Sequence, residues 1–67
     1  MAQDITVYNS TDDSRPYLIA SGSTVADFYE IVTGYPPSPN MQPPYVDGVS
    51  VPWITVLVQG NHAIWGN

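Results

Sequence analysis

The sequence has 67 residues, with six acidic side chains against one arginine, Arg15, and no lysine, so its net charge is −5. A chain this short forms one small domain, spanning residues 1–67, whose core roughly balances an ordering entropy of about 1.5 kcal/mol per residue. Because phosphate backbones are bound through lysine and arginine, the charge argues against a nucleic-acid partner. The absence of cysteine excludes a disulfide framework and a thiolate metal site.

Charged residues make up only 10% of the chain, whereas an average soluble domain carries about 25%. A surface that is poor in charge and rich in tyrosine, proline and tryptophan is typical of one that another molecule covers. No apolar run is long enough to span a bilayer, and Met1–Asp4 lacks the basic and apolar regions of a signal peptide. We therefore expect a protein partner or self-assembly, no membrane contact, and a location in the cytoplasm or in a virion assembled there.

Two β-forming runs open the chain, Ile5–Tyr8 and Tyr17–Ala20, with the turn-prone stretch Asn9–Ser14 between them. They predict an antiparallel hairpin. Pro16 stands at the entry to the second strand, where a missing backbone donor is tolerated. The two adjacent aspartates of the turn diverge from each other and are interpreted as solvated rather than as a metal site.

A capped helix is predicted over Val25–Thr33. Thr24 can accept a hydrogen bond from an early helical amide while Asp27 reaches back to the start of the helix. Gly34 suits the left-handed position that ends a helix. The apolar face of this helix, at spacings of three and four residues, consists of Val25, Phe28, Tyr29 and Val32.

The stretch Tyr35–Pro44 contains five prolines, which excludes a helix or an interior strand and favours extended backbone. It is either a stiff connector or an exposed segment that binds a partner. Tyrosine and tryptophan beside such a segment are favoured interface residues. The candidate partner-binding residues are therefore Tyr35, Pro36, Pro37, Pro39, Pro43, Pro44, Tyr45, Trp53 and Trp65.

The last third of the chain predicts a second hairpin, because Asp47-Gly48 is a strong two-residue turn signal between Tyr45–Val46 and Val49–Val51. Pro52 ends that hairpin. The remaining elements are an apolar run at Trp53–Leu57, a turn at Gln59–Asn61 and a last strand at His62–Trp65.

The predicted core uses aliphatic and phenyl side chains, which suffice for a domain of this size and leave Tyr35, Tyr45, Trp53 and Trp65 partly spare. These four side chains either contact a partner or wrap the edge of the small core. His62 is the one histidine, the residue type whose unperturbed pKa lies near neutrality, but no nucleophile motif accompanies it. It is therefore interpreted as a solvent-facing strand residue. We expect no catalytic residue, no cofactor and no metal site. The predicted core residues are Ile5, Val7, Leu18, Val25, Phe28, Val32, Leu57 and Ile64.

The order of these parts resembles the ubiquitin-like β-grasp fold, and it is nearest in pattern to the small sulfur-carrier proteins of molybdopterin and thiamine synthesis. The resemblance implies an α+β fold with a mixed sheet of four to five strands and one helix. The alternative is a small all-β barrel in which residues 24–33 form only a turn of helix. The positions that carry the resemblance are Gly22-Ser-Thr24, Asp27, Asp47-Gly48, Val51-Pro52, Thr55, Leu57 and Gly60.

The sulfur carriers act through a flexible tail that ends in Gly-Gly, whereas this sequence closes with Gly66-Asn67. The other common use of the fold is to present a sheet face or edge to a partner. We therefore expect a non-enzymatic protein-binding or structural module, oligomeric or part of a larger assembly, such as a phage structural or capsid-decorating protein. Two alternatives stay open: an atypical sulfur carrier or ubiquitin-like modifier acting with an adenylating enzyme, and an acidic inhibitor of a host protein.

Overall fold

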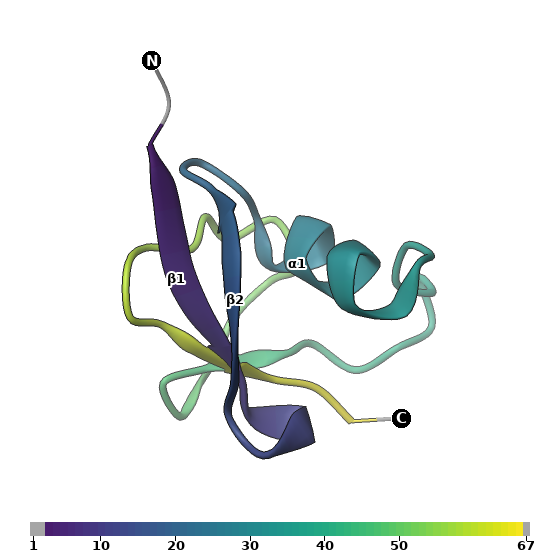
Figure 1. Ribbon diagram of the computed structural model, residues 1–67. Helices are drawn as coiled ribbons and strands as arrows, with labels where there is room; N and C mark the ends of the chain where they lie inside the picture. Colours follow the sequence, from purple (N-terminus) through teal and green to yellow (C-terminus); the bar gives the residue numbers. More distant parts are fainter. Residues whose placement is uncertain (1–2, 67) are drawn as a thin grey trace.

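The computed structural model describes residues 3–66, in which five strands form one mixed sheet and a single helix crosses one of its faces (Figure 1). The expected α+β class is confirmed. The helix has nine residues, so the all-β alternative is wrong. The elements are β1 (Asp4–Asn9), the short 3₁₀ helix η1 (Ser10–Asp12), β2 (Arg15–Ala20), α1 (Val25–Thr33), β3 (Tyr45–Val46), β4 (Val49–Ser50) and β5 (His62–Ile64).

The strand order across the sheet is β2-β1-β5-β3-β4. The first and last strands are neighbours at its centre and run parallel, with Tyr8 beside His62. Every other pair of neighbours is antiparallel. Parallel neighbours need a long crossover connection, and here that connection contains α1, the proline-rich loop and the second hairpin.

The first hairpin is confirmed, and both of its strands are longer than the sequence predicts. Val7 pairs with Tyr17 and Ile5 with Ile19. Because successive strand residues point to opposite faces, the residues paired in this way face α1, while Leu18 points away from it. The turn uses η1 and two residues with positive φ.

The helix begins and ends where the sequence predicts. The hydroxyl of Thr24 accepts from the backbone N–H of Asp27 at 3.2 Å, and the Asp27 carboxylate accepts from the backbone N–H of Thr24 at 3.0 Å. This reciprocal pair satisfies two amides that the first turn leaves free. Gly34 adopts φ 88° and donates to the Glu30 carbonyl at 2.8 Å, closing the helix.

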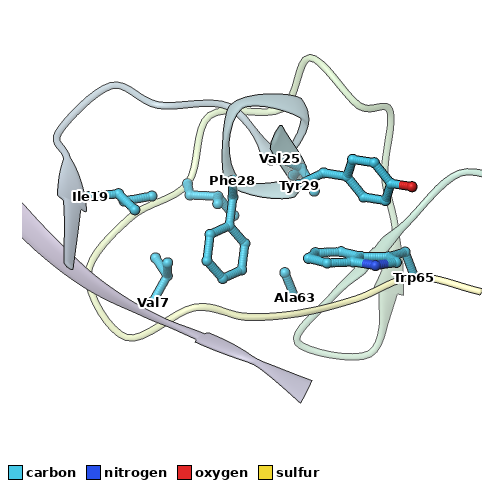
Figure 2. Packing of buried hydrophobic residues seen from close by; sticks show 8 residues of the cluster. Val7, Ile19, Val25, Phe28, Tyr29, Ala63 and Trp65 are labelled. Carbon is cyan, nitrogen blue, oxygen red and sulfur yellow. The ribbon is translucent and has the colours of Figure 1, made fainter. Parts of the chain in front are cut away.

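The core lies between α1 and the sheet (Figure 2). The Phe28 ring reaches down from the helix toward Val7 and Ala63, and its edge meets the Trp65 ring at 5.7 Å between centroids. The Tyr29 ring meets Trp65 at 5.1 Å. The buried hydrophobic side chains are Val7, Ile19, Val25, Phe28, Tyr29, Leu57, Ala63 and Trp65.

Two members of the predicted core lie outside it. Leu18 is 69% exposed and Ile64 is 42% exposed. Both are one residue out of phase with the inward-facing side chains of their strands, so their neighbours Ile19 and Trp65 fill the core instead. A one-residue shift in phase moves a strand side chain to the opposite face, which is the physical reason that this part of the prediction is wrong.

The end of the chain is tied to the first turn. The Trp65 backbone N–H donates to the Thr11 hydroxyl at 3.0 Å, and that hydroxyl lies 3.3 Å from the Trp65 carbonyl. Asp47 and Gly48 both adopt positive φ, as the predicted two-residue turn of the second hairpin requires. In residues 3–66 no helix combines the length and the apolar character that crossing a membrane requires.

Candidate interaction surface

The sheet has one face packed against α1 and one face free of it, which we call the open face. Alternation along each strand assigns the residues of this face, because the neighbours of inward-facing Val7, Ile19 and Ala63 point the other way. Its members are Asp4, Thr6, Tyr8, Pro16, Leu18, Ala20, Tyr45, Ser50, His62 and Ile64.

Cross-strand pairs join these residues into a continuous surface. Thr6 lies opposite Leu18 in the hairpin of β1 and β2, and Tyr45 lies opposite Ile64 in the pair of β3 and β5. Side chains directly opposite each other on one face of a sheet are in contact distance. The open face therefore carries aliphatic and aromatic groups from β2 across to β3.

The centre of the open face is an aromatic stack between strands. The rings of Tyr8 and His62 lie 4.6 Å apart between centroids with 17° between their planes. The Ser10 hydroxyl lies 3.5 Å from Nδ1 of the imidazole. These contacts hold the imidazole flat against the tyrosine ring.

The open face carries one carboxylate, that of Asp4 at the start of β1, opposite Ala20 of β2. Its other members include no carboxylate, lysine or arginine. The nearby Asp47 carboxylate accepts from the Asn61 side-chain amide at 2.7 Å and from the His62 backbone N–H at 3.0 Å. The Asp47 carboxylate therefore links the turn of the second hairpin to the start of β5.

The nine residues proposed from the sequence as partner-binding do not form one surface. Tyr35 and Tyr45 are exposed, but Tyr45 belongs to the open face while Tyr35 lies beyond the end of α1, with its ring 6.0 Å from that of Tyr29. The prolines at 36, 39 and 43 are exposed, Pro37 and Trp53 are half-buried, and Pro44 and Trp65 are buried.

Of the residues on the open face, the sequence interpretation named only Tyr45 as a candidate contact residue, and it left out all the others, including Tyr8, Leu18, His62 and Ile64. A signal for them existed in the two-residue alternation of β1, β2 and β5. It could be used only once the phase of each strand relative to the helix was known, because short apolar runs such as Tyr17–Ala20 are compatible with either phase.

The aromatic groups around Tyr29 belong to the core. Burial raises the pKa of the Tyr29 phenol above its ordinary value of 10.0, and the neighbouring Tyr35 adds to the effect. The phenol is therefore protonated at neutral pH and is no base. Trp53 meets the Tyr29 ring at 5.3 Å, and its indole Nε1 is buried without a hydrogen-bond partner among residues 3–66.

Within the described part of the chain, no cluster of three or more His, Asp or Glu side chains could hold a metal ion. A hollow on the outer side of α1, lined by Asp27, Glu30 and Ile31, is open to solvent, and the carboxylate of Asp27 there already caps the helix.

Comparisons with protein-family models, with curated proteins and with solved structures find no match for this chain. The feature that the geometry provides is the open face, a surface of mostly uncharged side chains on strands that are hydrogen-bonded to their neighbours.

Proposed function

We propose that this chain is a non-enzymatic protein-binding module of the β-grasp class that presents the open face of its sheet to a partner protein. The strand order, the parallel central pair and the single helix on one face support the β-grasp assignment. A structural role in a multi-copy assembly, such as capsid decoration, is one form that this function takes.

The observation that carries the proposal is the run of uncharged side chains across the open face, centred on the stack of Tyr8 and His62. Exposed apolar patches that cross several elements mark interaction sites in soluble proteins. Aromatic rings give large contact area and lose little conformational freedom on binding.

Backbone pairing on the two central strands makes this surface rigid before binding. β1 is paired on both sides, with β2 and with β5, and β5 is paired with β1 and β3. A partner that docks here does not have to order these strands, which reduces the entropic cost of association. Burial of the aliphatic groups then contributes about 25 cal/mol for each Å² removed from water.

Two tyrosines provide a matched test. Tyr45 lies on the open face and Tyr35 outside it, and both are exposed. Wild-type protein, Tyr45→Ser and Tyr35→Ser would each be immobilised and exposed to extract from the cells in which the chain is made. We expect one specific protein to be retained by the wild type and by Tyr35→Ser, and to be lost with Tyr45→Ser.

Three results of that experiment would contradict the proposal. Equal retention by all three forms would mean that the open face is not used. Loss with Tyr35→Ser alone would assign binding to the proline-rich loop, and retention of an adenylating enzyme would support the sulfur-carrier alternative instead.

A further inference from the structure

The turn of the second hairpin contains the one aspartate of the chain that is followed by glycine. Asp47 precedes Gly48, whereas each of the other four aspartates precedes a residue with a side chain. The carboxyl group of an aspartate can react with the backbone nitrogen of the next residue to form a cyclic imide, and glycine has no Cβ to hinder that approach. Asp47 and Gly48 are both exposed, so water reaches this turn.

The backbone nitrogen of Gly48, which is the nucleophile of this reaction, is free. Among residues 3–66 the Gly48 N–H donates no hydrogen bond. Beyond its two neighbours in the chain, no atom lies within 4 Å of the position that a Cβ would occupy on Gly48. The turn therefore has space for an imide ring.

The carboxylate of Asp47, in contrast, is held by the start of β5. One of its oxygens accepts from the Asn61 side-chain amide at 2.7 Å, and the other accepts from the His62 backbone N–H at 3.0 Å. Closure of the imide ring removes one carboxyl oxygen as water, so at least one of these hydrogen bonds is lost in the reaction. The reaction therefore requires a local separation of the turn from β5.

We propose that Asp47-Gly48 is a site of spontaneous aspartate isomerisation, and that the hydrogen bonds from Asn61 and His62 to the Asp47 carboxylate control its rate. The Gly48 nitrogen attacks Cγ of the protonated Asp47 side chain. The N–Cγ bond forms, the bond from Cγ to the hydroxyl oxygen breaks, and the hydroxyl leaves as water with the amide proton.

Water then opens the imide at either of its two carbonyls. Addition at the main-chain carbonyl of Asp47 breaks its bond to the Gly48 nitrogen and leaves Gly48 attached through the Asp47 side chain, which is the isoaspartate product. One water is released and one is consumed, so the mass of the chain does not change and no oxidant or cofactor is needed.

Isomerisation weakens the attachment of the second hairpin to β5. The isoaspartate link lengthens the main chain by one methylene within a two-residue turn, and turn geometry fixes the register of a hairpin. The side-chain carboxylate that Asn61 and His62 bind is consumed in the new peptide link. Because β3 and β5 pair directly beside this turn, with Tyr45 opposite Ile64, the modification also loosens the position of Tyr45 on the open face.

The first test compares folded and unfolded wild-type protein. Both samples would be incubated at the same neutral pH, one in buffer and one in urea, and isoaspartate at position 47 would be measured by mass spectrometry with fragmentation that distinguishes the two linkages. We expect the product to form about tenfold or more slowly in the folded protein, because the reaction there requires local opening. The isomerised fraction, separated by chromatography, should unfold at a lower urea concentration than the unmodified protein.

A matched pair of variants tests the control by Asn61. Asn61→Asp keeps the side-chain oxygen that accepts from the Val58 N–H and removes the amide that donates to Asp47. Asn40→Asp makes the same chemical change in the exposed proline-rich loop. We expect isoaspartate at position 47 to form about threefold or more faster in folded Asn61→Asp than in Asn40→Asp, because a hydrogen bond to a charged group is lost.

The proposal is overturned if unfolded wild-type protein forms no isoaspartate at position 47, or if the folded and unfolded chains form it at the same rate. Equal rates in the two folded variants would also overturn it. If Asn61→Asp does not fold, the comparison of folded and unfolded wild type decides. The reaction involves no partner, so its failure leaves the proposed function standing.

Discussion

The imidazole of His62 lies flat against the phenol ring of Tyr8, with 4.6 Å between the ring centroids. The two residues are paired in register in the parallel pair of β1 and β5, where the first and last strands of the chain meet. This contact therefore joins the two ends of the sequence on the surface that we propose binds a partner.

The stack should contribute modestly to stability. In a double-mutant cycle of Tyr8→Ala and His62→Ala, we expect a coupling free energy of about 0.5–1 kcal/mol, typical of an aromatic pair beyond its area burial. Urea unfolding of the four proteins at a pH well above the range in which histidine ionises gives this value. Additive effects of the two substitutions would mean that the rings do not interact in solution.

Two adjacent residues of β2 test which face of that strand is buried. Ile19→Ala should reduce the free energy of unfolding by about 2–5 kcal/mol, because it leaves a cavity beneath α1. Leu18→Ala should change it by about 0.5 kcal/mol or less, because that side chain faces solvent. Chemical unfolding of both variants measures the contrast, and a larger effect at Leu18 would require the opposite phase for β2.

The helix cap is a separate contribution to stability. Thr24→Ala removes the hydroxyl that accepts from the Asp27 amide, and should reduce the free energy of unfolding by about 1 kcal/mol. Ser21→Ala is the control, since the Ser21 hydroxyl makes no hydrogen bond within residues 3–66. Equal stability of the two variants would show that the capping box is not formed.

The raised pKa of Tyr29 leads us to expect a loss of stability at alkaline pH. Below its ordinary pKa of 10.0 the phenol is neutral in both the folded and unfolded states. As the pH rises through that value, the unfolded chain loses the proton first, since burial and Tyr35 raise the pKa of Tyr29 in the folded state. The free energy of unfolding therefore falls with rising pH until the folded phenol also ionises.

Tyr29→Phe removes the titrating group and should flatten this decline relative to the wild type. Urea unfolding between about pH 9 and pH 11 measures the difference. The other four tyrosines remain in both proteins and serve as the internal reference. The same slope in both proteins would contradict the buried environment of the Tyr29 phenol.

The features that the sequence predicts correctly are local. The cap formed by Thr24 and Asp27 and the turn at Asp47-Gly48 are encoded within a few neighbouring residues, and both form as expected. The long-range features are harder to predict. The apolar run at Trp53–Leu57 forms a turn and one bridge, from Val56 to Thr24, because the chain beside it turns into α1 directly after Thr24.

Of the open face, the sequence predicts only Tyr45 as a contact residue, because the face is built by long-range pairing between strands. The sequence predicts a partner contact for Trp65, whereas in the structure this side chain is buried beside Phe28 and Tyr29. Leu18 and Ile64, which the sequence predicts to be core residues because they are aliphatic, lie instead on the open face. Composition alone does not separate these two groups, since the distinction depends on strand phase.

The measurement that tests the central claim most directly is site-specific photocrosslinking inside the cells that make the protein. A photoreactive residue would replace Leu18 on the open face, with Ile31 on the outer side of α1 as the matched exposed control. The proposed function predicts a discrete adduct with one protein from position 18 and none from position 31. No adduct from position 18, or the same adduct from both positions, would contradict it.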